Sequence, residues 1–172
     1  MLKPPVVAFD TGVVPLLSGK MWLDSETGTP PAAWTSPGFS DTSWMQGKAT
    51  TFPRTPYLSN LHLRAKFEVS DPAQAKDLTL SVTYCGGVKV FLNGKEIGRA
   101  NIPEGAALAD GYPEEAFVNE NGTMISSAAW TADHRKAVPI RERKLTLPLP
   151  EHLLRAGVNI LSIEVVRAPY NK

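Results

Sequence analysis

Six residues that could contact a sugar lie in one long polar segment, between residues 101 and 143. Sugar recognition needs an aromatic face against the C–H groups of the ring and planar polar side chains for its hydroxyls. The predicted ligand-binding residues are Trp130, Tyr112, Asn119, Asp133, His134 and Arg135. Trp130 is the main candidate for the aromatic platform. The alternative is that Trp130 fills one end of the domain and anchors the segment, because tryptophan is usually largely buried.

Carboxylates in the same segment raise the question of glycoside hydrolysis, which needs two carboxyl groups facing each other across the scissile bond. The adjacent Glu114 and Glu115 do not converge in this way, and they are interpreted, like Asp110 and Asp133, as solvated loop charge. The sequence contains no G-x-S-x-G nucleophile elbow and no phosphate-binding glycine loop. We therefore expect a protein that is not an enzyme.

Metal binding is predicted only weakly by the sequence. The histidines His62, His134 and His152 are scattered and show no zinc-ligand spacing. Calcium accepts loop carboxylates and backbone carbonyls that leave no linear motif, so a structural calcium ion is compatible with the sequence. The carboxylates that could contribute to such a site are those of Asp24, Glu26, Asp41 and Glu164. No other cofactor is predicted.

Alternating hydrophobic residues predict the strands that must position the polar segment. Residues 61–69 and 78–84 place apolar side chains at every second position, which indicates strands with one buried and one wettable face. The pair Asn93-Gly94 supplies the two positive φ angles of a type I′ turn, so residues 88–98 are predicted to form a β-hairpin.

The remaining segments fit the same architecture. Strands are predicted over 145–149 and 158–166 and, near the N-terminus, at 6–9 and 21–23, whereas 24–60 and 101–140 are predicted to be long loops. Residues 150–157 resemble one or two helical turns, with Pro150 early and Gly157 in the αL position that ends them. The predicted fold is an all-β, two-sheet antiparallel jelly-roll β-sandwich with long loops.

Composition limits the classes of partner. With 18 basic and 17 acidic residues, the chain has no charge excess that would favour nucleic acid or an anionic membrane surface. Its 172 residues suit one domain, 1–172, with an insertion at about 101–143. No apolar run is long enough to span a bilayer. The single cysteine, Cys85, cannot form an internal disulfide.

Three segments resemble one known family. Trp34 followed by Pro37-Gly38-Phe39-Ser40-Asp41-Thr42-Ser43-Trp44 resembles the W…PGFDDSSW segment of galactose-binding-like jelly rolls, including the sugar-binding domains of family 2 glycoside hydrolases. Residues 88–98 are similar to their V-x-V-x-L-NGKEVG hairpin, and residues 153–165 to their L-GxNxLAIEV close. The matched residues belong to the scaffold, so the resemblance implies the fold, with Trp44 in the core, more than a ligand.

Two functions follow as expectations. The first is a non-catalytic carbohydrate-binding accessory module of a larger extracellular or periplasmic protein, such as a glycoside hydrolase, with glycan or neighbouring domains of the same polypeptide as partners. An export signal would then lie upstream of the present sequence. The alternative is a structural or protein-interaction β-sandwich module without a glycan ligand.

Overall fold

The computed structural model describes residues 6–9, 16–22, 30, 33–46, 60–125 and 132–169. Their elements in chain order are β1 (Val6–Phe9), β2 (Leu16–Trp22), β3 (Met45–Gln46), β4 (Asn60–Val69), β5 (Thr79–Tyr84), β6 (Gly87–Leu92), β7 (Lys95–Ala100), the 3-10 helix η2 (Glu114–Ala116), α1 (Ala132–Arg141), β8 (Arg143–Pro148), the 3-10 helix η3 (Glu151–Leu153) and β9 (Gly157–Val166). No helix in the described ranges has both the length and the apolar composition needed to cross a membrane.

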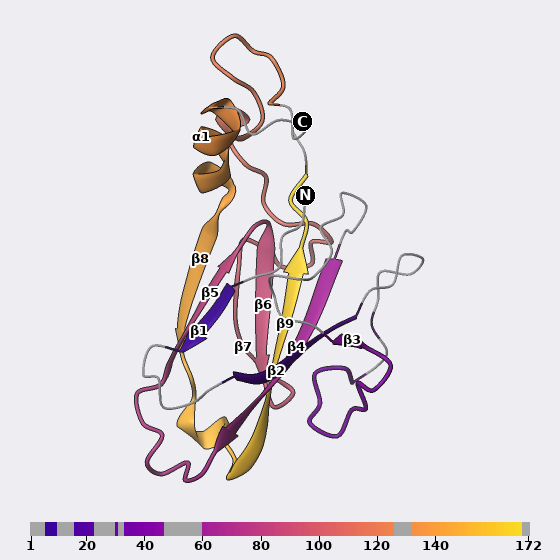
Figure 1. The fold of residues 1–172 in the computed structure, drawn as a ribbon, viewed down its shortest axis with the longest axis vertical. Helices are drawn as coiled ribbons and strands as arrows, with labels where there is room; N and C mark the ends of the chain where they lie inside the picture. Colours follow the sequence, from indigo (N-terminus) through magenta and orange to yellow (C-terminus); the bar gives the residue numbers. More distant parts are fainter. Residues whose placement is uncertain are drawn as a thin grey trace.

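The strands form two antiparallel sheets that face each other (Figure 1). One sheet has the strand order β1-β5-β8 and the other the order β3-β2-β4-β9-β6-β7. The two long strands β4 and β9 pair along their whole length, from Asn60 opposite Val166 to Val69 opposite Gly157. The predicted all-β, two-sheet jelly-roll sandwich is therefore confirmed.

The core lies between the sheets and is made by the alternating residues that the sequence singles out. From β4, Leu61 and Phe67 are buried, and from β5, Leu80 and Val82 are fully buried. The central strands β6 and β9 add a further set of buried residues: Val88, Val90, Leu92, Leu161, Ile163 and Val165. Burying a side chain of this size contributes roughly 1.5–3 kcal/mol, so this interface is the main source of stability.

The opposite face of β4, predicted to be wettable, is so only at its second half, where Lys66 is half-buried and Glu68 is exposed. His62 and Arg64 are both only 2% exposed, because segment 33–46 packs over them. The Arg64 guanidinium donates to Asp41 Oδ2 at 3.2 Å and to the carbonyl oxygens of Trp34 and Ser36. Trp44 is 5% exposed, which confirms its predicted place in the core.

The hairpin between β6 and β7 has the predicted turn. Asn93 and Gly94 have φ angles of 50° and 88°, as a type I′ turn requires. The Asn93 side chain donates to Leu153 O and Asn159 Oδ1, both at 2.8 Å, and accepts from Ile160 N–H at 2.9 Å. Asn93 thereby joins the turn to the start of β9.

Among the described strands, β7 lies at one edge of the larger sheet. It is six residues long, and its exposed side chains Lys95, Glu96 and Arg99 are charged. The β6–β7 register shifts between Val90 and Phe91, which marks an irregularity in the ladder.

Several local predictions need correction. The second strand is Leu16–Trp22 rather than 21–23. The turns expected at 150–157 are a single 3-10 turn that ends at Leu153, and Gly157, although its φ is +83°, begins β9 instead of ending a helix. The loop expected at 101–140 contains the ten-residue helix α1.

Candidate functional site

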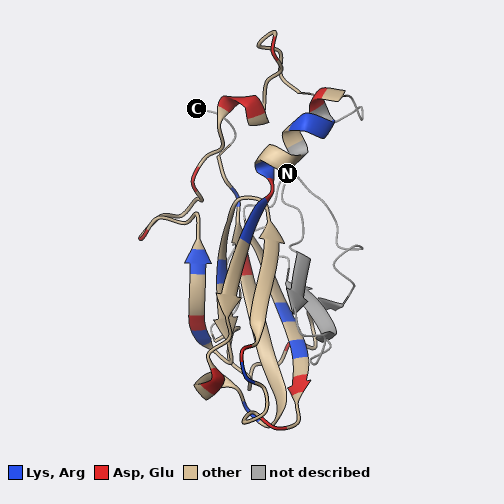
Figure 2. Ribbon diagram, turned by 90° about the vertical axis from the view of Figure 1, so that its left-hand side faces the viewer, with Lys and Arg blue, Asp and Glu red and all other residues tan. Residues whose placement is uncertain are grey.

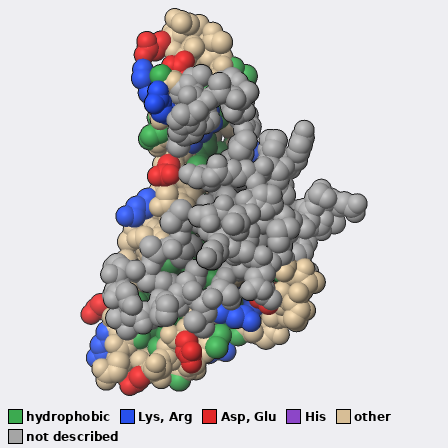
Figure 3. Space-filling view, in the orientation of Figure 1, with side chains coloured by type: hydrophobic (Ala, Val, Ile, Leu, Met, Phe, Trp, Pro, Cys, Tyr) green, Lys and Arg blue, Asp and Glu red, His purple; other side chains and the backbone are tan. Residues whose placement is uncertain are grey.

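The insertion leaves the sandwich after β7 and returns at β8, and it extends beyond one end of the sheets (Figures 1 and 3). Its first part is held by a small apolar cluster of Ile102, Ala109, Val166 and Ala168, against which Tyr112 packs. The base of the insertion is therefore part of the folded domain.

Arg143, the first residue of β8, connects the base of the insertion to the turn between β5 and β6. Its guanidinium donates to the carbonyl oxygens of Gly86 at 2.7 Å and Gly111 at 2.9 Å, and it lies 4.0 Å from the ring centroid of Tyr112. The Tyr112 hydroxyl accepts a hydrogen bond from the Gly86 N–H. Burial raises the pKa of Tyr112 above its ordinary value of 10.0, so this phenol is neutral at physiological pH.

A second arginine places helix α1 against η2. Arg141 donates from Nε to the carbonyl oxygen of Ala116 at 2.6 Å, and its guanidinium lies 5.0 Å from the ring centroid of Phe117. Ala116 and, on α1, Ala137 are buried. The two helices thus form a small unit of their own at the end of the molecule.

A tight loop after η2 positions Asn119. Its Oδ1 accepts the backbone N–H groups of Asn121 at 3.0 Å and Thr123 at 2.9 Å, while Val118 and Met124 form a β-bridge. With the amide oxygen fixed in this way, Asn119 Nδ2 points to α1 and donates to Asp133 Oδ2 at 3.3 Å.

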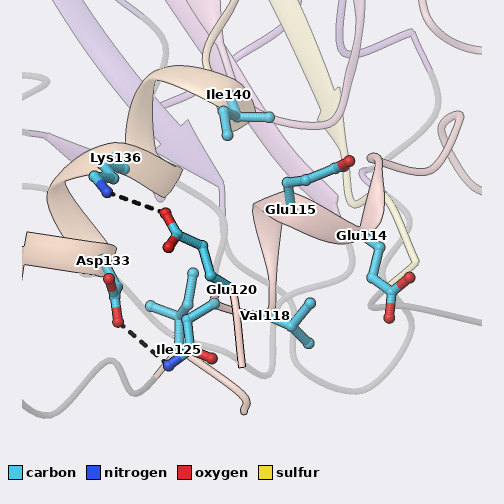
Figure 4. A pocket seen from close by; sticks show the side chains of 9 residues that line it. Glu114, Glu115, Val118, Glu120, Ile125, Asp133, Lys136 and Ile140 are labelled. Atoms are coloured by element: carbon cyan, nitrogen blue, oxygen red, sulfur yellow. Dashed lines mark hydrogen bonds and ion pairs between the residues drawn. The ribbon is translucent and has the colours of Figure 1, made fainter. Parts of the chain in front are cut away.

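The helices and this loop line an open pocket of about 310 Å³ (Figure 4). It is lined by Glu114, Glu115, Val118, Asn119, Glu120, Ile125, Asp133, Lys136 and Ile140. On its polar side Asp133 meets Asn119, and Lys136 Nζ lies 3.6 Å from Glu120 Oε1. The apolar part is made by Val118, Ile125 and Ile140. The pocket can therefore offer both hydrogen-bonding groups and apolar contact to a small ligand.

The structure brings two of the six predicted site residues together. Asn119 and Asp133 line the pocket and contact each other. Tyr112 lies at the base of the insertion, with its hydroxyl bonded to Gly86, and Arg135 is exposed on α1 without lining the pocket. Trp130 lies outside the described residues, and so does the side chain of His134.

Most of the remaining lining residues were not predicted. Glu114 and Glu115 were interpreted as solvated charge, and both are exposed, but they also line one side of the pocket. The sequence does contain one usable signal. Asp133, Lys136 and Ile140 are spaced three and four residues apart, which places them on one face of a helix.

The carboxylates considered for calcium are in part paired with cations. Asp41 pairs with Arg64, while Glu164 lies 3.1 Å from Lys89 Nζ and 3.7 Å from His62 Nε2. Within the described ranges, no three His, Cys, Asp or Glu side chains converge on a possible metal position. Asp24 and Glu26 lie outside these ranges.

Glu164 is the clearest electrostatic feature of the sheet. Burial raises the pKa of its carboxyl group, but the interactions with the neighbouring His62 and with Lys89, which donates a hydrogen bond at 3.1 Å, outweigh that effect and hold the pKa below the ordinary 4.5. The ring of Trp34 lies 5.0 Å from that of His62 and 5.8 Å from that of Phe91. This polar network therefore lies under aromatic side chains.

Comparison with known proteins gives a likeness of fold only. No protein-family model and no curated protein matches the sequence. Over 96% of its length the chain is similar to 22% of the β-glucuronidase from Ruminococcus gnavus in complex with D-glucuronic acid, with 10% identity and a TM-score of 0.45. A second structure, of the Ruminococcus gnavus β-glucuronidase, matches 90% of this chain with 21% of its own length. The sequence identity is 11% and the TM-score is 0.46. The chain spans about a fifth of the length of these enzymes, and a similarity this low assigns no activity.

Proposed function

We propose that this chain is a non-catalytic carbohydrate-binding accessory module of a larger extracytoplasmic protein, and that the pocket in the insertion is its glycan site. The observation that carries the proposal is the pairing of Asn119 with Asp133 beside an apolar surface, in a pocket of about 310 Å³. Ligand pockets typically measure about 300–1,000 Å³, so this pocket lies at the lower end of that range and suits a small ligand such as a single sugar unit.

The chemistry of the lining residues supports this ligand class. The amide of Asn119 and the carboxylate of Asp133 lie 3.3 Å apart and supply donor and acceptor groups to adjacent hydroxyls. Val118, Ile125 and Ile140 offer an apolar surface for the C–H groups of a ring. Trp130, three residues before Asp133 in the sequence, remains the proposed stacking residue.

Binding of the intact chain to a glycan array, followed by titration of the best ligand, tests the proposal. We expect Asp133→Ala to weaken binding about tenfold or more, because a hydrogen bond to a charged group is worth about 1.5–3 kcal/mol. Lys136→Met should also weaken binding.

A matched control is Lys144→Met, because Lys144 is exposed on β8 and does not line the pocket. This variant should bind like the parent, and all three variants should keep the parent melting temperature. If all three variants bind the glycan with equal affinity, the pocket is not the glycan site.

The non-catalytic part of the proposal is tested on the same ligand. Incubation with the intact chain should release no new reducing ends over the background rate. Turnover that disappears in the Asp133→Ala variant would show a hydrolase instead.

A structural or protein-interaction module is the second candidate. The observation in its favour is that Leu108, Met124 and Ile140 are exposed by 42%, 61% and 40%, and all three lie in the insertion. A blank glycan array together with a lowered melting temperature of Trp130→Ala would favour this function.

A further inference from the structure

The pocket has a strong excess of negative charge. Four of its lining residues are acidic, namely Glu114, Glu115, Glu120 and Asp133, and one, Lys136, is basic. With these groups ionised, the lining carries four negative charges and one positive, a net charge of −3. The whole chain carries a formal charge of only +1, so this excess is local.

Among the residues that the structure describes, the neighbouring cations do not cancel this excess. Lys136 is already paired with Glu120, and Arg141 is bonded to the carbonyl oxygen of Ala116 and does not line the pocket. Arg135 is exposed on α1 and is not a lining residue either. Figure 2 shows acidic and basic residues at this end of the molecule. The charged residues that line the pocket are mostly acidic.

The arrangement of the carboxylates does not suit a metal ion. Asp133 is bonded to Asn119, Glu120 to Lys136, and Glu114 and Glu115 stand on η2, on another wall (Figure 4). Among the described residues no three such groups converge on one point. The negative charges are therefore spread over the lining instead of converging on one point.

We infer that the pocket selects uncharged or amino-bearing sugars and excludes acidic ones such as uronates and sulfated sugars. This inference rests on the proposed function, since it names the glycan class for the same site. Like charges brought together oppose binding and provide specificity by repulsion. Three unit charges about 10 Å from a ligand carboxylate in water weaken its binding about tenfold when salt is as low as about 0.01 M.

The test compares three forms of one ligand. The neutral oligosaccharide that binds best on the array is titrated against the intact chain beside its counterpart with a C6 carboxylate and its counterpart with a free amine, below the pKa of that amine. In about 0.01 M salt we expect the acid to bind about tenfold more weakly than the neutral form, and the amine to bind at least as well as the neutral form.

Titrations at low and high salt distinguish two reasons for weak binding of the acid: charge repulsion, which salt screens, and the loss of a hydrogen bond to the replaced hydroxyl, which salt does not screen. The Debye length falls from about 30 Å at 0.01 M to about 3 Å at 1 M salt. The difference between the acid and the neutral form should therefore shrink severalfold at about 1 M salt, whereas binding of the neutral form should stay nearly constant. A difference that persists unchanged in high salt contradicts the inference.

A charge variant provides the second readout. The double substitution Glu114→Gln and Glu115→Gln removes two of the carboxylates and should narrow the difference between acid and neutral ligand about threefold or more. The control is Glu68→Gln with Glu151→Gln, which alters the net charge equally at exposed positions outside the pocket.

The outcomes distinguish the two proposals. If the acid binds as well as or better than the neutral form, or if both double variants act alike, charge selection is wrong while glycan binding stands. If no glycan of any charge binds, the proposed function itself fails.

Discussion

On the outer face of the larger sheet, Arg64 is buried and Glu164 is half-buried, and each contacts groups of opposite or complementary charge. Arg64 is held by Asp41 and by backbone carbonyls of the segment 33–46. Glu164 is held between His62 and Lys89. A buried charge without a partner is costly, so these contacts fix the loop and the strands relative to each other.

Glu164 makes the stability of the protein depend on pH. Its pKa in the folded state is below the ordinary 4.5, so its contribution to the free energy of unfolding is fully present above about pH 4.5 and is lost as the pH falls through the lower folded value. We expect Glu164→Gln to flatten the decrease in stability below pH 4.5, measured as urea midpoints from neutral to acidic pH.

Glu68→Gln is the matched control, since Glu68 is exposed on β4, the strand that pairs with β9. Its pH profile should follow that of the parent. Parallel profiles of the parent and Glu164→Gln would show that the native contacts of Glu164 do not favour its charged form.

At the residue scale, the sequence predicted which residue types line the pocket better than it predicted which residues each of them contacts. Asn119 and Asp133 were selected because amide and carboxylate groups suit sugar hydroxyls, and they do share a pocket. Tyr112 was selected for its ring, yet its position depends on contacts with Gly86 and Arg143. Those partners lie 26 and 31 positions away in the sequence, so local patterns contain no sign of them.

At the scale of elements, the passage from one sheet to the other is made by Cys85 and Gly86, between β5 and β6. Gly86 has a φ of +99°, and a Cβ atom there would lie 2.1 Å from the carbonyl oxygen of Val166. Only glycine fits this crossing, because the obstructing atom belongs to the backbone of β9.

Gly86→Ala should therefore reduce the free energy of unfolding by about 3 kcal/mol or more, through strained φ and backbone displacement together. Gly105→Ala is the control, since Gly105 also has a positive φ, +74°, but has no atom within 4 Å of the added Cβ. That variant should lose only about 1–2 kcal/mol, as measured by urea unfolding. If both variants lose the same free energy of unfolding, the contact of the added Cβ atom with Val166 O does not contribute to the loss.

Elements with strong periodicity were predictable, and those held by tertiary contacts were not. The alternation over 61–69 and the Asn93-Gly94 turn determine β4 and the hairpin locally. Helix α1 was missed because Pro139 stands inside it and only Ala137 among its described side chains is buried. A proline usually ends or kinks a helix, and here the contact of Arg141 with η2 supports the segment.

At the scale of the whole molecule, a sandwich with a large core supports a smaller unit that contains the pocket. The joint between them depends on Arg143, which bonds the β5–β6 turn at Gly86 and the insertion at Asp110 and Gly111. The planar guanidinium reaches all three carbonyls, and a lysine cannot reproduce that geometry.

We expect Arg143→Lys to raise amide hydrogen exchange of residues 101–125 about tenfold, while exchange in β4 and β9 stays unchanged, because local opening costs less than global unfolding. Arg99→Lys on β7, whose partner Glu96 is on the same strand, should leave both regions unchanged. Faster exchange throughout the sandwich after Arg143→Lys would show that the insertion and the core unfold as one unit.

Strand β7 has a consequence for behaviour at high concentration. An unpaired strand offers free N–H and C=O groups to other chains, and it can serve as a template for aggregation. Here the strand is short and carries the charged residues Lys95, Glu96 and Arg99. Its pairing with β6 also contains a register shift. Each of these features obstructs strand addition from a neighbouring molecule, so we expect this edge of the sheet to resist amyloid-like growth.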